Sequence, residues 1–152
     1  MLTDKKNDLL YILNILESIE KIWTYSAESE SAEELYELND QMNLNACLNL
    51  LANIGESIGK ISDDLKLNNP NVEWRKIKDF RNKISHDYMG IDVLITFKVI
   101  NDNLKNLKNS LIEILSYRIS IKILDLDEYL VAKKSKYYKH IEFQQIDKKI
   151  ST

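Results

Sequence analysis

The chain of 152 residues is poor in the residues that build tight turns, with only one proline and three glycines. Sandwiches and barrels of β-strands need many such turns, so this scarcity argues against an all-β fold and favours helices joined by few loops. The single cysteine, Cys47, cannot form an intrachain disulfide, which fits a reducing cytosol. Cys47 lies in an apolar periodic stretch, so we expect it to pack in the core.

We also expect no targeting segment and no membrane span, and the chain carries no global positive charge. No apolar run is long enough to cross a bilayer, and the N-terminus shows no signal-peptide pattern. We therefore expect a cytoplasmic protein without membrane association. The net charge is -3 and the pI is about 5.5, so any nucleic-acid binding must come from a local basic patch.

Hydrophobic residues make up 44% of the chain, enough for one domain with a real core. They recur at helical spacing in four long segments with short connections between them. This pattern predicts an all-α, up-and-down four-helix bundle over residues 1–116. The expected long helices span approximately residues 4–25, 40–69, 74–87 (or up to 90) and 92–116.

Several local signals refine this prediction. Ser31 and Glu34 form a capping-box pattern, in which the glutamate returns to the Ser31 amide, before a short helix. Gly55 and Gly59 lie four residues apart in the second long helix, which predicts close approach of a neighbouring helix. In the fourth helix, the core position between Phe97 and Leu104 could be Ile100 or Asn101.

Residues 117–152 form an expected C-terminal extension of unknown structure. Residues 118–123 alternate between polar and apolar side chains like a strand, and residues 127–138 could be helical. His140 has no partner motif, so we expect it at the surface. The extension could mediate contact with a partner.

The segment from Trp74 to Tyr88 carries the strongest chemical signal. Histidine can transfer protons near neutral pH, and the arginine fork matches phosphate oxygens, so His86 and Arg81 are candidate catalytic residues. On a helix, the apolar residues 77, 80 and 84 share one face, His86 projects roughly opposite, and Arg81 lies on the flank. The segment is also strongly basic, which predicts RNA binding by Arg75, Lys76, Lys78 and Lys83.

Two simpler interpretations of the same residues stay open on spacing alone. An arginine and a histidine near the end of a helix stabilise the negative end of the helix dipole. A basic run on a helix is often only a solvated face.

The pattern R-x-x-x-x-H-x-Y from Arg81 to Tyr88 resembles the signature of HEPN-superfamily ribonucleases. The resemblance to HepT-like toxins covers about residues 9–115 and includes Ile54-Gly55-Glu56, Pro70, Trp74, Asn82 and Gly90-Ile91-Asp92. It implies the HEPN fold and a metal-independent endoribonuclease that acts as the toxin of a prokaryotic toxin–antitoxin system.

The resemblance also implies roles for individual residues. Arg81 and His86 would be the catalytic pair: His86 transfers protons while Arg81 stabilises the charge that develops on the phosphate. Asn82 would bind the phosphate or orient His86, and Glu56 could hold the Arg81 guanidinium. No cofactor is implied, and the sequence has no His/Cys/Asp cluster at metal-ligand spacing.

Partners follow from the same resemblance. One histidine cannot comfortably be both acid and base, so a homodimer with a composite site is expected. A cognate minimal nucleotidyltransferase antitoxin (MNT) would use ATP to attach AMP to Tyr88, which would block RNA by charge and bulk. The alternatives are a non-catalytic HEPN binding module that partners a nucleotidyltransferase, and a purely structural helical dimer.

Overall fold

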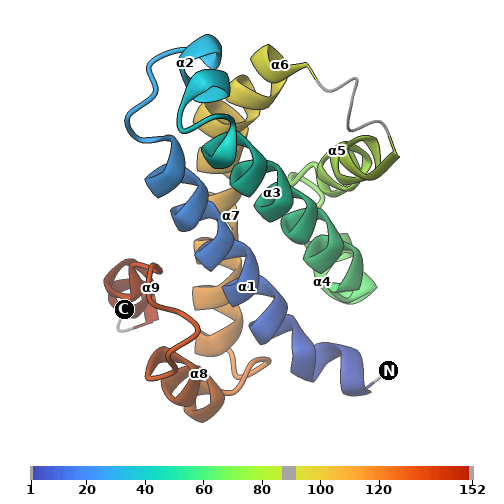
Figure 1. Cartoon of the computed structure of the whole chain (residues 1–152). Coiled ribbons are helices and arrows are strands. Elements are labelled where there is room, and N and C mark those ends of the chain that lie inside the picture. Colours follow the sequence, from blue (N-terminus) through green and yellow to red (C-terminus); the bar gives the residue numbers. More distant parts are fainter. Residues whose placement is uncertain (1, 87–91, 151–152) are drawn as a thin grey trace.

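The computed structural model describes residues 2–86 and 92–150, with the side chains of residues 8–80, 82–83 and 92–150 (Figure 1). Throughout these residues the regular structure is helical, which confirms the predicted all-α class. The helices are α1 (Leu2–Ser26), α2 (Ala32–Glu37), α3 (Met42–Lys60), α4 (Asp63–Asn68), α5 (Trp74–His86), α6 (Val93–Lys98), α7 (Leu104–Ser120), α8 (Leu126–Lys133) and α9 (Phe143–Ile150), with the π-helical turn η2 (Val99–Asn103) between α6 and α7.

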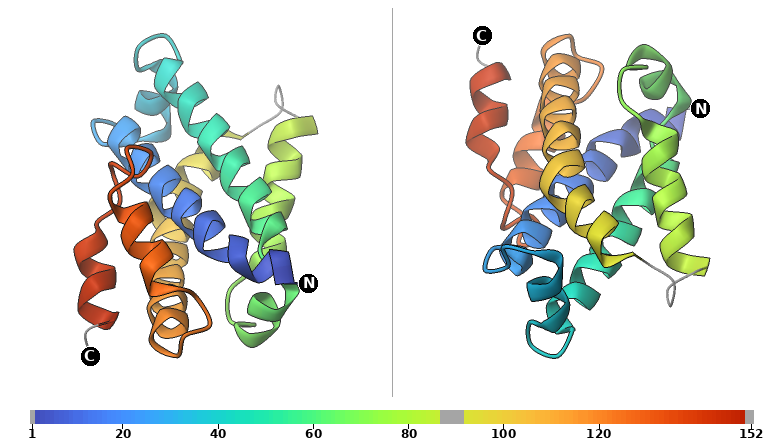
Figure 2. Two further views of the ribbon diagram at one scale, coloured as in Figure 1. Left: turned by 90° about the horizontal axis from the view of Figure 1, so that it is seen from below. Right: turned by 90° about the horizontal axis from the view of Figure 1, so that it is seen from above.

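The bundle is built from α1, α3, α5 and the continuous α6–η2–α7 helix. Helix α3 packs against α1 on one side and α5 on the other, and α7 packs against α1 (Figures 1 and 2). The predicted apolar stripes form the shared core, with Ile12, Cys47 and Leu111 among its fully buried members. Burial raises the pKa of the Cys47 thiol to about 11, as expected for a cysteine that packs in the core. Among the described helices, none combines the length and apolar character that a bilayer span requires.

The predicted second helix is interrupted, so the expectation of one helix over residues 40–69 was wrong. Helix α3 ends at Lys60, and α4 begins after Ser62, whose side chain accepts a hydrogen bond from the Leu65 amide at 3.3 Å. The buried carboxylate of Asp8 in α1 accepts hydrogen bonds from the Ser62 amide at 2.8 Å and the Ser62 hydroxyl at 2.5 Å. This contact between α1 and the α3–α4 junction stabilises the break, because a continuous helix would use the Ser62 amide internally.

The predicted N-cap of α2 is confirmed, but the predicted hydrogen bond from the Ser31 amide to the Glu34 carboxylate was wrong. The Ser31 hydroxyl accepts from the Glu34 amide at 3.2 Å, as an N-cap should. The Glu34 carboxylate accepts from the amide of Glu30 at 2.7 Å instead of the Ser31 amide.

The fourth long helix contains a π-helical turn that the sequence periodicity did not predict. Asp92 caps its start as expected, accepting hydrogen bonds from the Leu94 and Ile95 amides. In the π-helical turn η2 each turn of the helix contains more residues than in an α-helix. Here the Ile100 carbonyl accepts a hydrogen bond from the Trp23 indole at 2.8 Å. Ile100 is buried and Asn101 is exposed, which resolves the ambiguous core position.

The strand-like alternation at residues 118–123 was misleading. Helix α7 continues to Ser120, and a turn follows in which the Ile123 and Leu124 amides donate to the Arg118 carbonyl. Only Ile119 of the three isoleucines is buried, at 4% exposure, whereas Ile121 and Ile123 are each 44% exposed. These three isoleucines therefore do not share one buried face, as alternate residues of a strand would. Helix α8 covers part of the expected helical segment, and the domain boundary at residue 116 stays a prediction.

The segment after α8 docks on the bundle through polar contacts to α1. The Tyr138 hydroxyl donates to the Asn14 side chain at 3.0 Å. The His140 amide donates to Glu17 at 2.7 Å, and the imidazole Nδ1 lies 2.6 Å from the second oxygen of the same carboxylate. His140 was expected at the surface, and its side chain is 35% exposed, but its contacts with Glu17 also anchor this segment on α1.

Replacing Tyr129 with phenylalanine tests how the tail is anchored. The buried Tyr129 hydroxyl donates to Asp147 at 2.7 Å, and the Lys133 ammonium contacts the other oxygen at 2.5 Å. Burial alone would raise the Asp147 pKa, but the bonds from Lys133 and Tyr129 outweigh it and lower the pKa below its ordinary value of 3.8. We expect Tyr129→Phe to lower the free energy of unfolding by about 1–2 kcal/mol at neutral pH.

The lowered pKa sets the direction of the pH dependence. Above the ordinary pKa of an aspartate, the Asp147 carboxylate is charged and contributes fully to the free energy of unfolding. This contribution is lost as the pH falls through the lowered pKa that Asp147 has in the folded protein. Urea unfolding of wild type and Tyr129→Phe should therefore show a difference at neutral pH that shrinks in strong acid. An equal difference at both pH values would contradict this assignment.

Candidate functional site

Helix α5 carries the predicted catalytic segment and presents four basic side chains to solvent. Asn69, just before Pro70, accepts a hydrogen bond at its carbonyl from the Trp74 indole at 3.0 Å, which anchors the first turn of α5. Ile77 and Phe80 are half-buried against the core, in agreement with the predicted apolar face. The side chains predicted to bind RNA are all exposed: Arg75, Lys76, Lys78 and Lys83.

The predicted catalytic residues Arg81 and His86 both lie in the second half of α5. Ideal helix geometry separates residues five apart by roughly 140° around the axis and 7.5 Å along it. The side chains of Arg81 and His86 lie outside the described part of the structure, as does the whole of Tyr88. Their roles in catalysis and modification therefore stay predictions.

The two predicted supporting residues occupy different surroundings. Asn82 is half-buried on α5, one residue beyond Arg81. Glu56 is 54% exposed on α3 and pairs with Lys60, one turn along the same helix, at 3.8 Å. An exposed pair of this kind contributes little to stability. The predicted contact between Glu56 and Arg81 stays a prediction, because the Arg81 side chain is not described.

Lys78 shows how closely α5 approaches α3. A Cβ atom added to Gly59 would lie 3.8 Å from the Lys78 Cε, so the aliphatic part of this lysine covers the glycine. This is an ordinary van der Waals distance to the end of a flexible side chain, so the close helix approach predicted at the glycines stays a prediction. Burial lowers the pKa of nearby Lys66; the charge of Asp63 opposes this effect and the charge of Lys78 adds to it. Lys66 and Lys78 thus extend positive charge from α5 onto α4.

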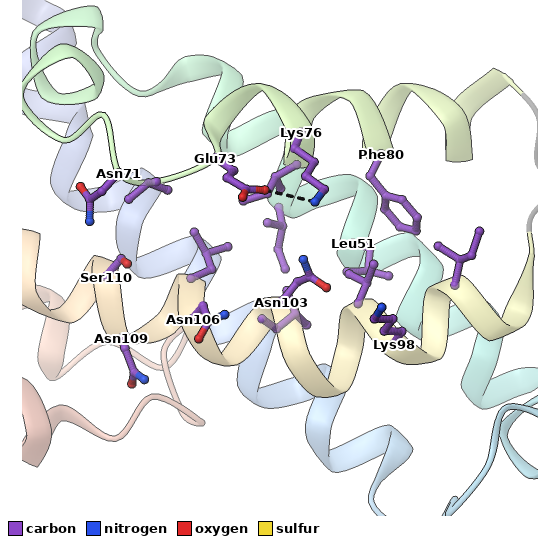
Figure 3. A pocket seen from close by; sticks show the side chains of 17 residues that line it. Leu51, Asn71, Glu73, Lys76, Phe80, Lys98, Asn103, Asn106, Asn109 and Ser110 are labelled. Carbon is purple, nitrogen blue, oxygen red and sulfur yellow. Dashed lines mark ion pairs between the residues drawn. The ribbon is translucent and has the colours of Figure 1, made fainter.

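A groove that no pattern in the sequence predicted lies between α5 and the α6–η2–α7 helix. Its volume is about 740 Å³, with Leu51 and Ile54 of α3 in its lining (Figure 3). On the α5 side it is lined by Lys76, Ile77 and Phe80, and on the opposite side by residues that include Lys98, Asn103, Asn106 and Asn109. The asparagines recur every three residues from Asn103 to Asn109, and this spacing was the one signal in the sequence that could have indicated a polar face.

The described residues contain no group of three or more His, Cys, Asp or Glu side chains that could hold a metal ion. The polar groups of the groove are instead amides, a serine hydroxyl, a glutamate and two lysines. Such groups can bind by hydrogen bonding and by attraction to anions.

Comparison with known proteins places these features in a family. A family model described as "Ribonuclease HepT-like" matches residues 15–114. The chain is 30% identical over 104 residues to the "Probable ribonuclease HepT" of Thermococcus cleftensis, covering 68% of this chain and 92% of that protein. It is 27% identical over 104 residues to "Putative RNase MJ1380" of Methanocaldococcus jannaschii, covering 68% and 93%. No solved structure matches the chain.

The family match begins within α1 and ends within α7, so α5 lies wholly inside it and α8 and α9 lie beyond it. The helical bundle and this family match both agree with the resemblance to HepT-like proteins seen in the sequence. The chain belongs to the HepT-like ribonuclease family.

Proposed function

We propose that this protein is a metal-independent endoribonuclease and the toxin of a prokaryotic toxin–antitoxin system. The observation that carries the proposal is the family match over residues 15–114, which contains the exposed basic helix α5 and the Arg81–His86 motif. Four exposed cations on one helix provide the local positive charge that an acidic protein needs in order to bind RNA.

In the proposed reaction the ribose 2′-hydroxyl attacks the adjacent phosphorus, and the bond from phosphorus to the 5′ oxygen breaks. The products are a 2′,3′-cyclic phosphate and a free 5′-hydroxyl. One proton leaves the attacking hydroxyl and one is delivered to the departing oxygen, which is the work of His86. The guanidinium of Arg81 neutralises the charge that builds on the phosphate, and Asn82 assists by binding phosphate or orienting His86.

The proposed functional unit is a homodimer, because two copies of His86 could divide the acid and base roles between them. The proposed antitoxin is a nucleotidyltransferase that transfers AMP from ATP to the Tyr88 hydroxyl. An attached AMP would add negative charge and bulk two residues from His86, and it would repel an incoming RNA phosphate. Family membership and the position of Tyr88 in the motif support this part of the proposal.

The direct test is cleavage of a defined single-stranded RNA by the purified protein, with and without EDTA. We expect the same rate in both conditions, since proton transfer and charge stabilisation come from side chains. The products should carry 2′,3′-cyclic phosphate ends, detected by mass spectrometry, and induced expression in a bacterial host should arrest growth. Loss of cleavage in EDTA would refute metal independence. A protein that neither cuts RNA nor arrests growth would favour the non-catalytic binding module.

A further inference from the structure

We propose that the groove between α5 and α6–η2–α7 binds single-stranded RNA, holding bases within it and phosphates along its rim. This inference rests on the proposed ribonuclease function and adds the place where the substrate strand lies. The groove is about 740 Å³ in volume and is lined by both apolar and polar side chains (Figure 3). Such a mixture suits nucleobases, which have apolar faces and polar edges.

Phe80 provides the surface on which a base can stack. It is half-buried, and its ring projects from α5 into the groove, where Leu51 of α3 also lies (Figure 3). Stacking of a base on an aromatic side chain tolerates any sequence, because every base has a π-face. The ring is attached one residue before Arg81, so a stacked base would lie beside the half of α5 that carries the motif.

Four asparagines provide hydrogen-bonding groups for base edges: Asn71, Asn103, Asn106 and Asn109. In the part of the chain that the structure describes, none of their side chains makes a hydrogen bond, although each amide has both donors and an acceptor. These are the groups that pair with the exposed edges of unpaired bases. An apolar helix in the same place would bury the amides without partners, which is unfavourable. RNA is therefore the better occupant.

The charges at the rim suit a phosphate backbone. Lys98 is exposed and makes no ion pair with any described residue. Lys76, on the opposite wall, pairs with Glu73 at 3.3 Å, but its side chain is 70% exposed, so a phosphate can compete for it. The lining extends along the helix from Ile95 to Ser110, or roughly 22 Å at 1.5 Å per residue, which accommodates a few nucleotides.

The test measures RNA affinity separately from cleavage. The probe is a fluorescently labelled single-stranded RNA with 2′-O-methyl groups, which cannot be cut by attack of the 2′-hydroxyl, and binding is followed by fluorescence anisotropy. Asn106→Asp places a negative charge in the groove, whereas Asn101→Asp adds the same charge to an exposed asparagine of the same continuous helix that does not line it. Phe80→Leu removes the aromatic ring and keeps an apolar side chain.

We expect Asn106→Asp and Phe80→Leu each to weaken binding by roughly tenfold, and Asn101→Asp to change it by less than about twofold. Circular dichroism melting verifies that each variant is folded. Equal weakening by Asn106→Asp and Asn101→Asp, or no weakening by Asn106→Asp, would overturn the proposal. So would conversion of a dimer to a monomer by Asn106→Asp in analytical ultracentrifugation, since the groove would then be an interface between copies.

The same measurements separate this inference from the proposed function. Wild-type protein that binds the probe through the groove but cuts no RNA would refute the ribonuclease proposal and support the groove. Wild-type protein that cuts RNA, with Asn106→Asp equally efficient at limiting substrate, would refute the groove and support the ribonuclease.

Discussion

Replacing His86 with alanine is expected to reduce the rate of RNA cleavage by about 10²–10⁴-fold, because the general acid–base group would be lost. Arg81→Ala should cause a loss of about 10²–10³-fold, since the charge developing on the phosphate would lose its donor. Arg81→Lys keeps the charge but not the planar fork, so we expect an intermediate rate. The measurement is the initial rate of cleavage of a labelled RNA under single-turnover conditions.

His140 offers a matched control, because it is the only other histidine of the chain. It lies beyond the family match and contacts Glu17 on α1, so His140→Gln should leave the cleavage rate near that of wild type. Thermal melting would establish that all variants are folded. Cleavage by His86→Ala at the wild-type rate, or an equal loss in both histidine variants, would show that the motif is not the catalytic centre.

Asp8→Ala is expected to produce the largest loss of stability, about 3 kcal/mol in the free energy of unfolding. The Asp8 carboxylate is buried and accepts two hydrogen bonds from Ser62, at 2.8 Å from the amide and 2.5 Å from the hydroxyl. Its removal leaves both groups of Ser62 without this acceptor at the junction of α3 and α4. Total stabilities of about 5–15 kcal/mol are usual for single domains, so this loss is a large fraction. Urea unfolding followed by circular dichroism measures it.

Two further variants show whether the loss of stability comes from the buried contact between Asp8 and Ser62. Asp8→Asn keeps one oxygen as an acceptor and gains an N–H group that can donate to the Ser62 hydroxyl. It should therefore lower the free energy of unfolding less than Asp8→Ala does. Asp125 is an exposed N-cap of α8, accepting from the Asp127 amide at 2.7 Å, and Asp125→Ala should cost only about 1 kcal/mol. If Asp8→Ala were no more destabilising than Asp125→Ala, the contact with Ser62 would not hold the junction.

Local signals in the sequence were sufficient for much of the fold. Pro70 correctly predicted where the helix before α5 ends, Asp92 predicted the start of α6, and the apolar spacing predicted the faces buried by the long helices. These features depend on hydrogen bonds and side-chain spacing within about one or two turns, which the sequence displays directly. The basic patch on α5 was predictable for the same reason, because neighbouring residues of one helix share its surface.

Features that depend on distant partners were not predictable in this way. The break between α3 and α4 involves Asp8, which is 54 residues away from Ser62 in the sequence. The π-helical turn is accompanied by a bond from the Trp23 indole to the Ile100 carbonyl, across 77 residues. The contact between His140 and Glu17 was not predictable either, because it joins residues 123 positions apart in the sequence.

The sequence by itself determined the helical class, the position of each long helix and the grouping of Arg81, His86 and the exposed cations on one helix. Tertiary structure alone decided where helices are interrupted, where the C-terminal segment docks and that a groove opens beside α5. The physical reason is the range of the interactions. Helix formation is governed by contacts three or four residues apart, whereas a groove is the space left when whole helices pack at their final distances.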